Sequence, residues 1–124
     1  MKVPVIAIID DDEQVRDGVK NLVRSLGYTA AVFSTAEEYL LSDCIRTSSC
    51  VVTDLRMPGI SGAELQKRLI AVGNRTPVIF MTAFADDSIR ANVLNAGAAG
   101  FLKKPFDDKL LVQCLENALG GNKG

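Results

Sequence analysis

The hydrophobic residues of this chain gather in short runs that alternate with segments of helical spacing. The runs at 5–9 and 51–54 are rich in β-branched residues, which is typical of buried strands. Similar runs predict strands over 29–33, 78–82 and 100–103. Because a helix separates each strand from the next, we predict a parallel sheet whose crossover helices cover its faces.

Helices are predicted wherever apolar residues recur every three or four positions between these strands. Gly27 and Gly97 are expected to end two of them. Ser34 and Glu37 have capping-box spacing, so we expect Ser34 to cap the second helix. Acidic residues are the expected caps of three other helices, namely Asp12, Asp86 or Asp87, and Asp107 or Asp108.

The predicted architecture is a single three-layer α/β domain. Strands that helices cover on both faces should be apolar throughout, and these runs have that character. The chain of 124 residues is long enough to bury one sizeable core. We expect residues 1–119 to form the domain and residues 120–124 to be a tail or the start of a linker.

Composition narrows the possible functions. The formal net charge of −1 gives the domain itself no basic surface for nucleic acid. The longest apolar stretch, Val3 to Ile9, is too short to span a bilayer, and it leads directly into acids, unlike a secretory signal. The absence of histidine disfavours a zinc site and Ser-His or Cys-His dyads. The cysteines lack metal-ligand spacing, so we expect three small buried hydrophobes and a reducing, cytoplasmic setting.

Polar residues at the carboxyl ends of the predicted strands are the candidates for chemistry. Parallel strands bring these ends to one edge of the sheet, where open α/β sheets bind ligands. Asp54 ends the third strand just before Pro58 and Gly59, and we expect its carboxylate to face solvent. The residues expected beside it are Asp10, Asp11, Thr82 and Lys104.

A cluster of three carboxylates predicts a cation site. The acids would repel one another and raise one another's pKa unless a cation neutralised them, and an all-oxygen site suits Mg²⁺. Lys104 and Thr82 could bind the oxygens of a phosphoryl group, whose transfer depends mainly on positioning and electrostatics. The carboxylate of Asp54 could itself be the nucleophile and form an aspartyl phosphate.

Four motifs of this chain resemble the receiver domain of two-component response regulators. They stand in the family's order, and the likeness extends from about Val5 to about Leu119. It implies the flavodoxin-like sheet of order 2-1-3-4-5. The string from Thr53 to Pro58 most resembles the FixJ-type branch. The motifs are Asp10-Asp11, Thr53 to Gly62, Thr82-Ala83 and Lys104-Pro105-Phe106.

The resemblance implies a role for each residue of the cluster. A sensor histidine kinase would phosphorylate Asp54, while Thr82 and Lys104 would hold the phosphoryl oxygens. Phe101 matches the switch aromatic, which turns inward as the threonine hydroxyl approaches the phosphoryl group; a plain core role for Phe101 is the alternative. The implied Mg²⁺ ligands are Asp11, Asp54 and the backbone carbonyl of Arg56, with Asp10 acting through bound water.

The resemblance also implies an output surface and partners. The helix that Gly97 ends, the strand 100–103 and the last helix would form the surface through which a phosphorylated homodimer could assemble. FixJ-type receivers usually precede a helix-turn-helix domain, so DNA would be bound only through a separate output domain that regulates transcription. The Lys104–Pro105 peptide would be cis. No membrane partner is expected.

Three other functions are compatible with parts of this sequence pattern. A stand-alone receiver or an aspartyl-phosphate phosphotransfer protein stays open. Phosphatases with an aspartyl intermediate typically place a second acid two residues after the nucleophile, where this chain has Arg56, so we do not expect a turnover enzyme. A degenerate receiver acting as a constitutive binding module is disfavoured by the intact cluster. Asp12 and Lys103 are interpreted as a helix cap and a solvated residue, and Phe84 is expected to shield the acyl phosphate from water.

Overall fold

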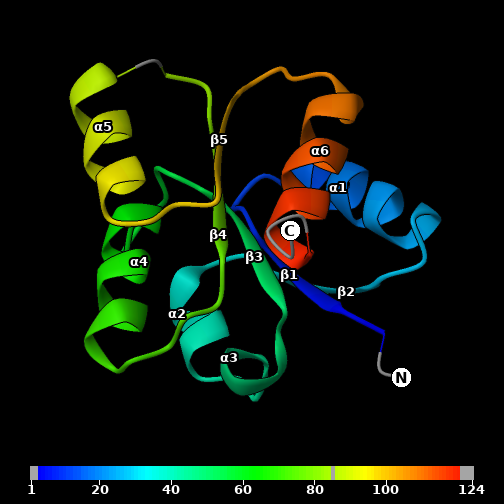
Figure 1. Ribbon diagram of the computed structural model, residues 1–124, viewed down its shortest axis with the longest axis horizontal. Coiled ribbons are helices and arrows are strands. Elements are labelled where there is room, and N and C mark those ends of the chain that lie inside the picture. Colours follow the sequence, from blue (N-terminus) through cyan, green and yellow to red (C-terminus); the bar gives the residue numbers. More distant parts are fainter. Residues whose placement is uncertain (1–2, 85, 121–124) are drawn as a thin grey trace.

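The computed structural model describes residues 3–84 and 86–120. Five parallel strands form one sheet of order β2-β1-β3-β4-β5, which confirms the predicted fold. Figure 1 shows this sheet nearly edge-on between two groups of helices. The strands are β1 Val5–Ile9, β2 Thr29–Phe33, β3 Cys50–Asp54, β4 Val78–Thr82 and β5 Gly100–Lys103.

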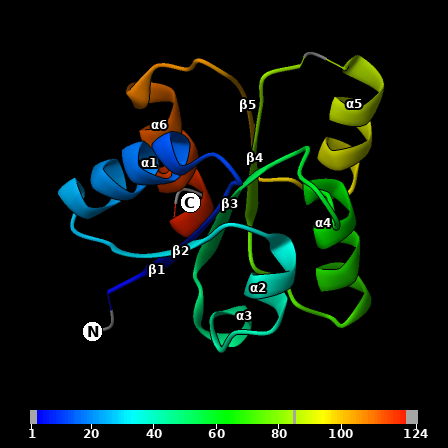
Figure 2. The same cartoon turned by 180° about the vertical axis from the view of Figure 1, so that it is seen from behind.

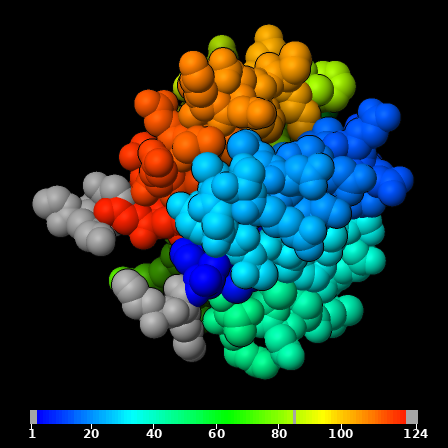
Figure 3. Space-filling view, turned by 90° about the vertical axis from the view of Figure 1, so that its right-hand side faces the viewer, coloured from blue at the N-terminus to red at the C-terminus, as the bar shows by residue number. Residues whose placement is uncertain are grey.

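Helices cover both faces of the sheet. Helices α1 and α6 pack on one face, and α2, α4 and α5 pack on the other (Figures 1 and 2). The bounds of the helices are α1 Glu13–Ser25, α2 Ala36–Leu40, α3 Cys44–Thr47, α4 Gly62–Ala71, α5 Asp87–Asn95 and α6 Asp108–Leu119. Figure 3 looks onto the face where α1 lies in the centre and the beginning of α6 lies above it.

The two cores arise from the alternation of side chains along each strand. Ile6 and Ile8 of β1 enter the core under α1 and α6, whereas Ala7 and Ile9 enter the core under α2, α4 and α5. All four are fully buried. The central strands are therefore apolar because both of their faces meet helices, as the sequence predicts.

The caps of α1, α5 and α6 agree with the sequence predictions, whereas the cap of α2 differs from its prediction. The side chains of Asp12, Asp86 and Asp107 accept hydrogen bonds from backbone N–H groups in the first turns of α1, α5 and α6. At α2 the expected cap Ser34 is wrong, because Thr35 accepts the bond from the N–H of Glu38 at 3.1 Å. The carboxylate of Glu38 accepts from the Ser34 backbone at 2.8 Å and from its hydroxyl at 2.9 Å. The capping pair therefore lies one residue later than predicted.

Other differences concern the margin of the domain. The short helix α3 was not predicted, since four residues are too few to show a helical period. The cysteine prediction is correct only for Cys50; Cys44 and Cys114 are half-buried. β2 is an edge strand with exposed Thr29 and Val32, so it is not covered as the central strands are. Within the described ranges, no helix is both long and apolar enough to cross a membrane.

Candidate functional site

The topology brings the predicted site residues to one edge of the sheet. β1 ends at Ile9, directly before Asp10, and Ile9 lies opposite Thr53 in β3. Asp54 ends β3, and Thr82 ends β4 opposite Lys103 of β5. Four strand ends therefore meet around Asp54, because parallel strands share the direction of their carboxyl ends.

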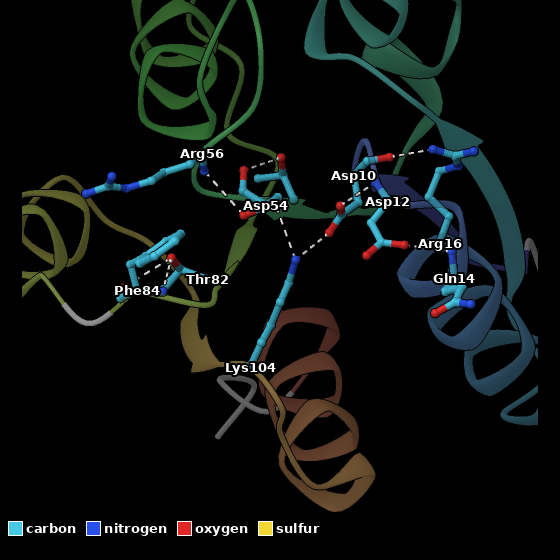
Figure 4. A network of polar contacts seen from close by, with 10 residues as sticks. Asp10, Asp12, Gln14, Arg16, Asp54, Arg56, Thr82, Phe84 and Lys104 are labelled. Carbon is cyan, nitrogen blue, oxygen red and sulfur yellow. Dashed lines mark hydrogen bonds and ion pairs between the residues drawn. The ribbon is translucent and has the colours of Figure 1, made fainter.

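The centre of the site is Lys104, which bridges two of the acids (Figure 4). Its ammonium donates to Oδ2 of Asp10 at 2.8 Å and to Oδ2 of Asp54 at 3.1 Å. The Asp10 side chain is fully buried, and those of Lys104 and Asp54 are 17% and 13% exposed. Charge-assisted hydrogen bonds of this kind are short and strong, so the three side chains hold one another in place.

Burial and ion pairing together determine the protonation of Asp10 and Lys104. Burial raises the pKa of Asp10, although hydrogen bonds from Lys104 and from the backbone N–H of Asp12 act in the opposite direction. Burial favours the neutral amine of Lys104 and so acts to lower its pKa. The hydrogen bonds to Asp10 and Asp54, together with the attraction of both carboxylates, outweigh burial, so the pKa of Lys104 is raised. The lysine is therefore a positive charge across the physiological pH range.

Three carboxylates lie close enough to share a cation. One oxygen each of Asp10, Asp11 and Asp54 falls within 4.8 Å of the others. Asp11 is exposed and the other two are buried, so the group opens to solvent on one side. Because all three donors are oxygens and few in number, the set fits Mg²⁺, which keeps several of its waters. Lys104 already bonds both buried acids, and its single positive charge offsets one of their two negative charges.

Asp54 is much less exposed than expected. The prediction that it faces solvent is wrong, since the residue is only 9% exposed. The start of α4 lies against the end of β3: a Cβ at Gly62 would collide with the backbone oxygen of Asp54. The backbone N–H of Gly62 also donates to the carbonyl of Leu55 at 2.9 Å. A helix held this close covers one flank of the acid, and Lys104 covers another.

Thr82 is at the predicted place, but its hydroxyl has other partners. It accepts from the backbone N–H of Phe84 at 3.1 Å and donates to the backbone carbonyl of Phe84 at 3.2 Å. Thr82 itself is 1% exposed. Within the described residues, the Thr82 hydroxyl therefore makes no hydrogen bond to Asp54.

The side chain of Arg56 points away from Asp10 and Asp54 (Figure 4). Its backbone N–H donates to Oδ1 of Asp54 at 3.3 Å. The guanidinium lies 5.2 Å from the ring centroid of Phe84, and one of its nitrogens is 3.8 Å from a carboxylate oxygen of Asp86. Arg56 and the 60% exposed Phe84 together form an outer cover on the β4 side of the site.

Phe101 lies beside this cover, at the predicted output surface. Its half-buried ring packs at the margin of the core under α5, and the guanidinium of Arg90 lies 5.8 Å from its centroid. Thr82, Arg90, Phe101 and Lys103 are among the residues that line a small surface hollow here. Lys103 is exposed, as predicted. The Lys104–Pro105 peptide is cis, also as predicted.

Two contributors to the site were missed from the sequence. Arg16 of α1 donates to the backbone carbonyl of Asp10 at 2.8 Å, and Glu37 of α2 accepts from the backbone N–H of Ile60 at 3.2 Å. In both cases the partner is a main-chain group outside the residue's own helix. The sequence assigned no role to Arg16 and placed Glu37 in a capping box with Ser34, so neither residue pointed to a contact outside its own helix.

This fold and site define a class of α/β signalling domains with an acidic pocket at the carboxyl edge of the sheet. The chain belongs to the response regulator receiver domain family, whose sequence profile matches residues 6–116. It is similar to the transcriptional regulatory protein FixJ of Azorhizobium caulinodans, with 39% identity covering 93% of this chain and 54% of that protein. Its identity to the response regulator protein TodT of Pseudomonas putida is 36%, covering 93% of this chain and 51% of TodT.

Solved structures lead to the same family. The response regulator StyR superposes with a TM-score of 0.90 at 38% identity, covering 98% of this chain and 62% of the StyR chain. FixJ-N superposes with a TM-score of 0.83 at 31% identity, covering 95% of this chain and 94% of FixJ-N. This chain spans about half the length of the curated relatives it matches.

Proposed function

We propose that this receiver domain accepts a phosphoryl group on Asp54 from a sensor histidine kinase and uses it to change conformation. The observation that carries the proposal is the bridge from Lys104 to Asp10 and Asp54, with the carboxylate of Asp11 within reach of both acids. This arrangement combines a nucleophilic carboxylate, a fixed positive charge and an oxygen-lined cation site. Phosphoryl transfer needs these groups and little else.

The chemistry follows from these positions. An oxygen of Asp54 attacks phosphorus, an O–P bond forms, and the N–P bond of the kinase's phosphohistidine breaks, leaving a histidine that takes up a proton. The ammonium of Lys104 lies 3.1 Å from Oδ2 of Asp54, close enough to bind the transferred oxygens from its present position. An ammonium fixed before the reaction stabilises their charge without reorganising.

Mg²⁺ would be held by Asp11, Asp54 and the backbone carbonyl of Arg56, with Asp10 acting through bound water. A bound Mg²⁺ would neutralise phosphoryl oxygens as the transfer proceeds. Asp11 is the exposed member of the set and the one without a bond to Lys104, so it is the natural first contact for a cation arriving from solvent.

The switch would begin at Thr82. To donate to a phosphoryl oxygen, its hydroxyl must release the backbone carbonyl of Phe84, the bond of 3.2 Å, because a hydroxyl has a single proton to donate. A modification shifts a conformational equilibrium only by what it binds differentially, and this exchange of partners supplies such a difference. Phe101 would follow by turning inward, which changes the surface made by α5, β5 and α6.

The proposal extends to the rest of the protein. Residues 1–119 would be the receiver, and residues 120–124, of which 121–124 lie outside the described residues, would begin a linker to a DNA-binding output domain. The support is that FixJ and TodT are about twice as long as the matched region. A stand-alone receiver or phosphotransfer protein is the alternative. Phosphorylated copies would pair through α5, β5 and α6, and the free cysteines suit a cytoplasmic setting.

The domain would not be a turnover enzyme. A phosphatase needs a group that protonates its leaving group, and the residue two positions after Asp54 is Arg56, whose guanidinium does not lose a proton in proteins. That side chain also points toward Phe84 and Asp86 rather than toward Asp54. Hydrolysis of the acyl phosphate would therefore be slow and limited to self-dephosphorylation.

The decisive experiment uses acetyl phosphate with Mg²⁺ and intact mass spectrometry. We expect one phosphoryl group to add to the wild-type protein, to be lost in alkali or hydroxylamine, and to be absent from Asp54→Asn. Asp43→Asn is the matched control, because Asp43 is an exposed acid far from the sheet edge and its loss should leave the adduct unchanged. No adduct on the wild type, or an equal adduct on Asp54→Asn, would overturn the proposal.

A further inference from the structure

Glu37 reaches from α2 to the loop that joins β3 to α4. Its Oε2 accepts a hydrogen bond from the backbone N–H of Ile60 at 3.2 Å. Gly59, the preceding residue, has a φ of 75°, and a Cβ there would collide with the same oxygen. The carboxylate therefore lies directly on the loop backbone, in space that only a glycine leaves open.

The middle of this loop has few other polar anchors. On either side of it, Leu55 donates to the carbonyl of Met81 at 2.8 Å and Gly62 donates to the carbonyl of Leu55 at 2.9 Å. Between them, within the described part of the chain, the bond to Glu37 is the only hydrogen bond that residues 57–60 make. Glu37 is thus the main polar restraint on the segment that directly follows Arg56.

The environment of Glu37 argues against a purely stabilising role. Its second oxygen, Oε1, is buried and has no hydrogen-bond partner within the described residues. A buried carboxylate oxygen without a partner is unfavourable, so it offsets part of what the bond to Ile60 contributes to stability. What the glutamate supplies is a fixed acceptor over the loop.

We propose that Glu37 is a positioning residue for the metal site: it holds the loop so that the backbone carbonyl of Arg56 stays in place to bind Mg²⁺. This inference rests on the proposed function. Residues that orient metal ligands without touching the metal are an established source of affinity. Glu37 acts through the main chain of Gly59 and Ile60, twenty-odd residues away in sequence.

Titration of the unphosphorylated protein with Mg²⁺ by calorimetry tests this role. We expect Glu37→Ala to weaken Mg²⁺ binding about tenfold, because the loss of a residue that orients a metal ligand typically has an effect of that size. Glu37→Gln keeps a carbonyl acceptor for the Ile60 N–H and should stay within about twofold of the wild type. Since both variants remove the same negative charge, the difference between them measures the hydrogen bond and not the charge. Amide exchange of Ile60 should be faster in Glu37→Ala alone.

Glu38→Ala is the matched control. It lies on the same helix and loses the bonds to Ser34, so it should lower the free energy of unfolding but leave the Mg²⁺ affinity within about twofold. Wild-type protein that binds Mg²⁺ together with a Glu37→Ala variant of equal affinity would overturn the inference and leave the proposed function standing. Wild-type protein that binds no Mg²⁺ would overturn both.

A double-mutant cycle with Gly59→Ala sharpens the assignment. A methyl group at Gly59 would push the carboxylate of Glu37 aside, so this variant should also bind Mg²⁺ more weakly. If the two residues act through their contact, Gly59→Ala should weaken binding less in the Glu37→Ala background than in the wild type. Additive effects of the two substitutions would contradict an action through this contact.

Discussion

The two flanks of Asp54 are built differently. On one flank, Lys104 bonds both Asp10 and Asp54, and these three side chains are almost completely withdrawn from solvent. On the other flank, the hydroxyl of Thr82 bonds the backbone of Phe84, and the Phe84 ring is 60% exposed. One flank is a closed network of charges, and the other is a neutral contact at the surface.

Under the proposed function, this difference separates the residues for phosphoryl transfer from those for signalling. A charge network that already has its geometry can stabilise a phosphoryl group without moving, which is what the reaction requires. A threonine with two replaceable backbone partners can exchange them, which is what a switch requires. Helix α5, which follows this flank, fits the role of a moving element, since Val93 is its only buried residue.

Removal of Lys104 should have the largest effect. Lys104→Ala removes the charge beside Asp54, so the rate of phosphorylation by acetyl phosphate should fall about 100-fold, the usual loss for one preorganised donor. The rate is measured by intact mass at saturating Mg²⁺, with circular dichroism as the test of folding. Lys103→Ala is the control, because Lys103 is exposed and bonds neither acid. A folded Lys104→Ala protein with the wild-type rate would show that this flank is not catalytic.

The next largest effect is expected at the close approach of α4 to β3. Gly62→Ala would place a methyl group against the backbone oxygen of Asp54, so we expect a loss of about 2 kcal/mol in the free energy of unfolding in urea. Gly18→Ala is the control: Gly18 lies in α1 with open space around it, and alanine there should stabilise the protein by about 0.5–1 kcal/mol. Equal stability of Gly62→Ala and the wild type would show that α4 shifts freely at this contact.

Asp10→Asn should stabilise the metal-free protein at neutral pH. Because burial raises the pKa of Asp10 in the folded state, the folded protein binds this proton more tightly than the unfolded chain does. This tighter proton binding contributes its full stability to the fold below the ordinary pKa of 3.8. The contribution is lost as the pH rises through the folded-state pKa of Asp10. The variant lacks this loss, so we expect its free energy of unfolding at pH 7 to exceed that of the wild type.

Urea unfolding in a chelating buffer, repeated at pH 7 and below pH 3.8, checks this prediction. The gain should be present at the higher pH and disappear at the lower, where Asp10 is protonated in both states. A gain of equal size at both pH values would mean that the buried charge is not its cause.

The smallest effect is expected on the outer cover. Phe84→Asn removes the ring that packs under Arg56, so water should reach the acyl phosphate more easily and its half-life should shorten about threefold. The half-life is followed by intact mass after acetyl phosphate is removed. Leu41→Asn changes a hydrophobic residue that is 90% exposed and should leave the half-life unaltered. An unchanged half-life in Phe84→Asn would show that the ring does not shield the site.

The strands and the positions of Asp10, Asp54, Thr82 and Lys104 could be predicted because the signals are local. Apolar runs identify the strands, and parallel topology then brings their ends together. The shift from Ser34 to Thr35 at the start of α2 could not be predicted, since neighbouring hydroxyls offer the same acceptor and the chain path decides between them.

Contacts across the fold were also beyond the sequence. The burial of Asp54 depends on Lys104 and on the approach of Gly62, which lie 50 and eight positions away. Glu37 reads as an ordinary acidic residue in a first turn, while its partner Ile60 lies 23 positions further on. The bonds of Thr82 to Phe84 are local, yet nothing in the sequence distinguishes them from bonds to a ligand.

The contact between Gly62 and the backbone of Asp54 has a consequence for how such chains diverge. The requirement for glycine comes from the path of the main chain and is independent of the carboxylate. A descendant that lost the acid at position 54 would still need glycine at position 62 to keep α4 in place. A glycine at position 62 would therefore indicate shared ancestry and architecture, whereas an acid at position 54 would indicate that the domain can still be phosphorylated.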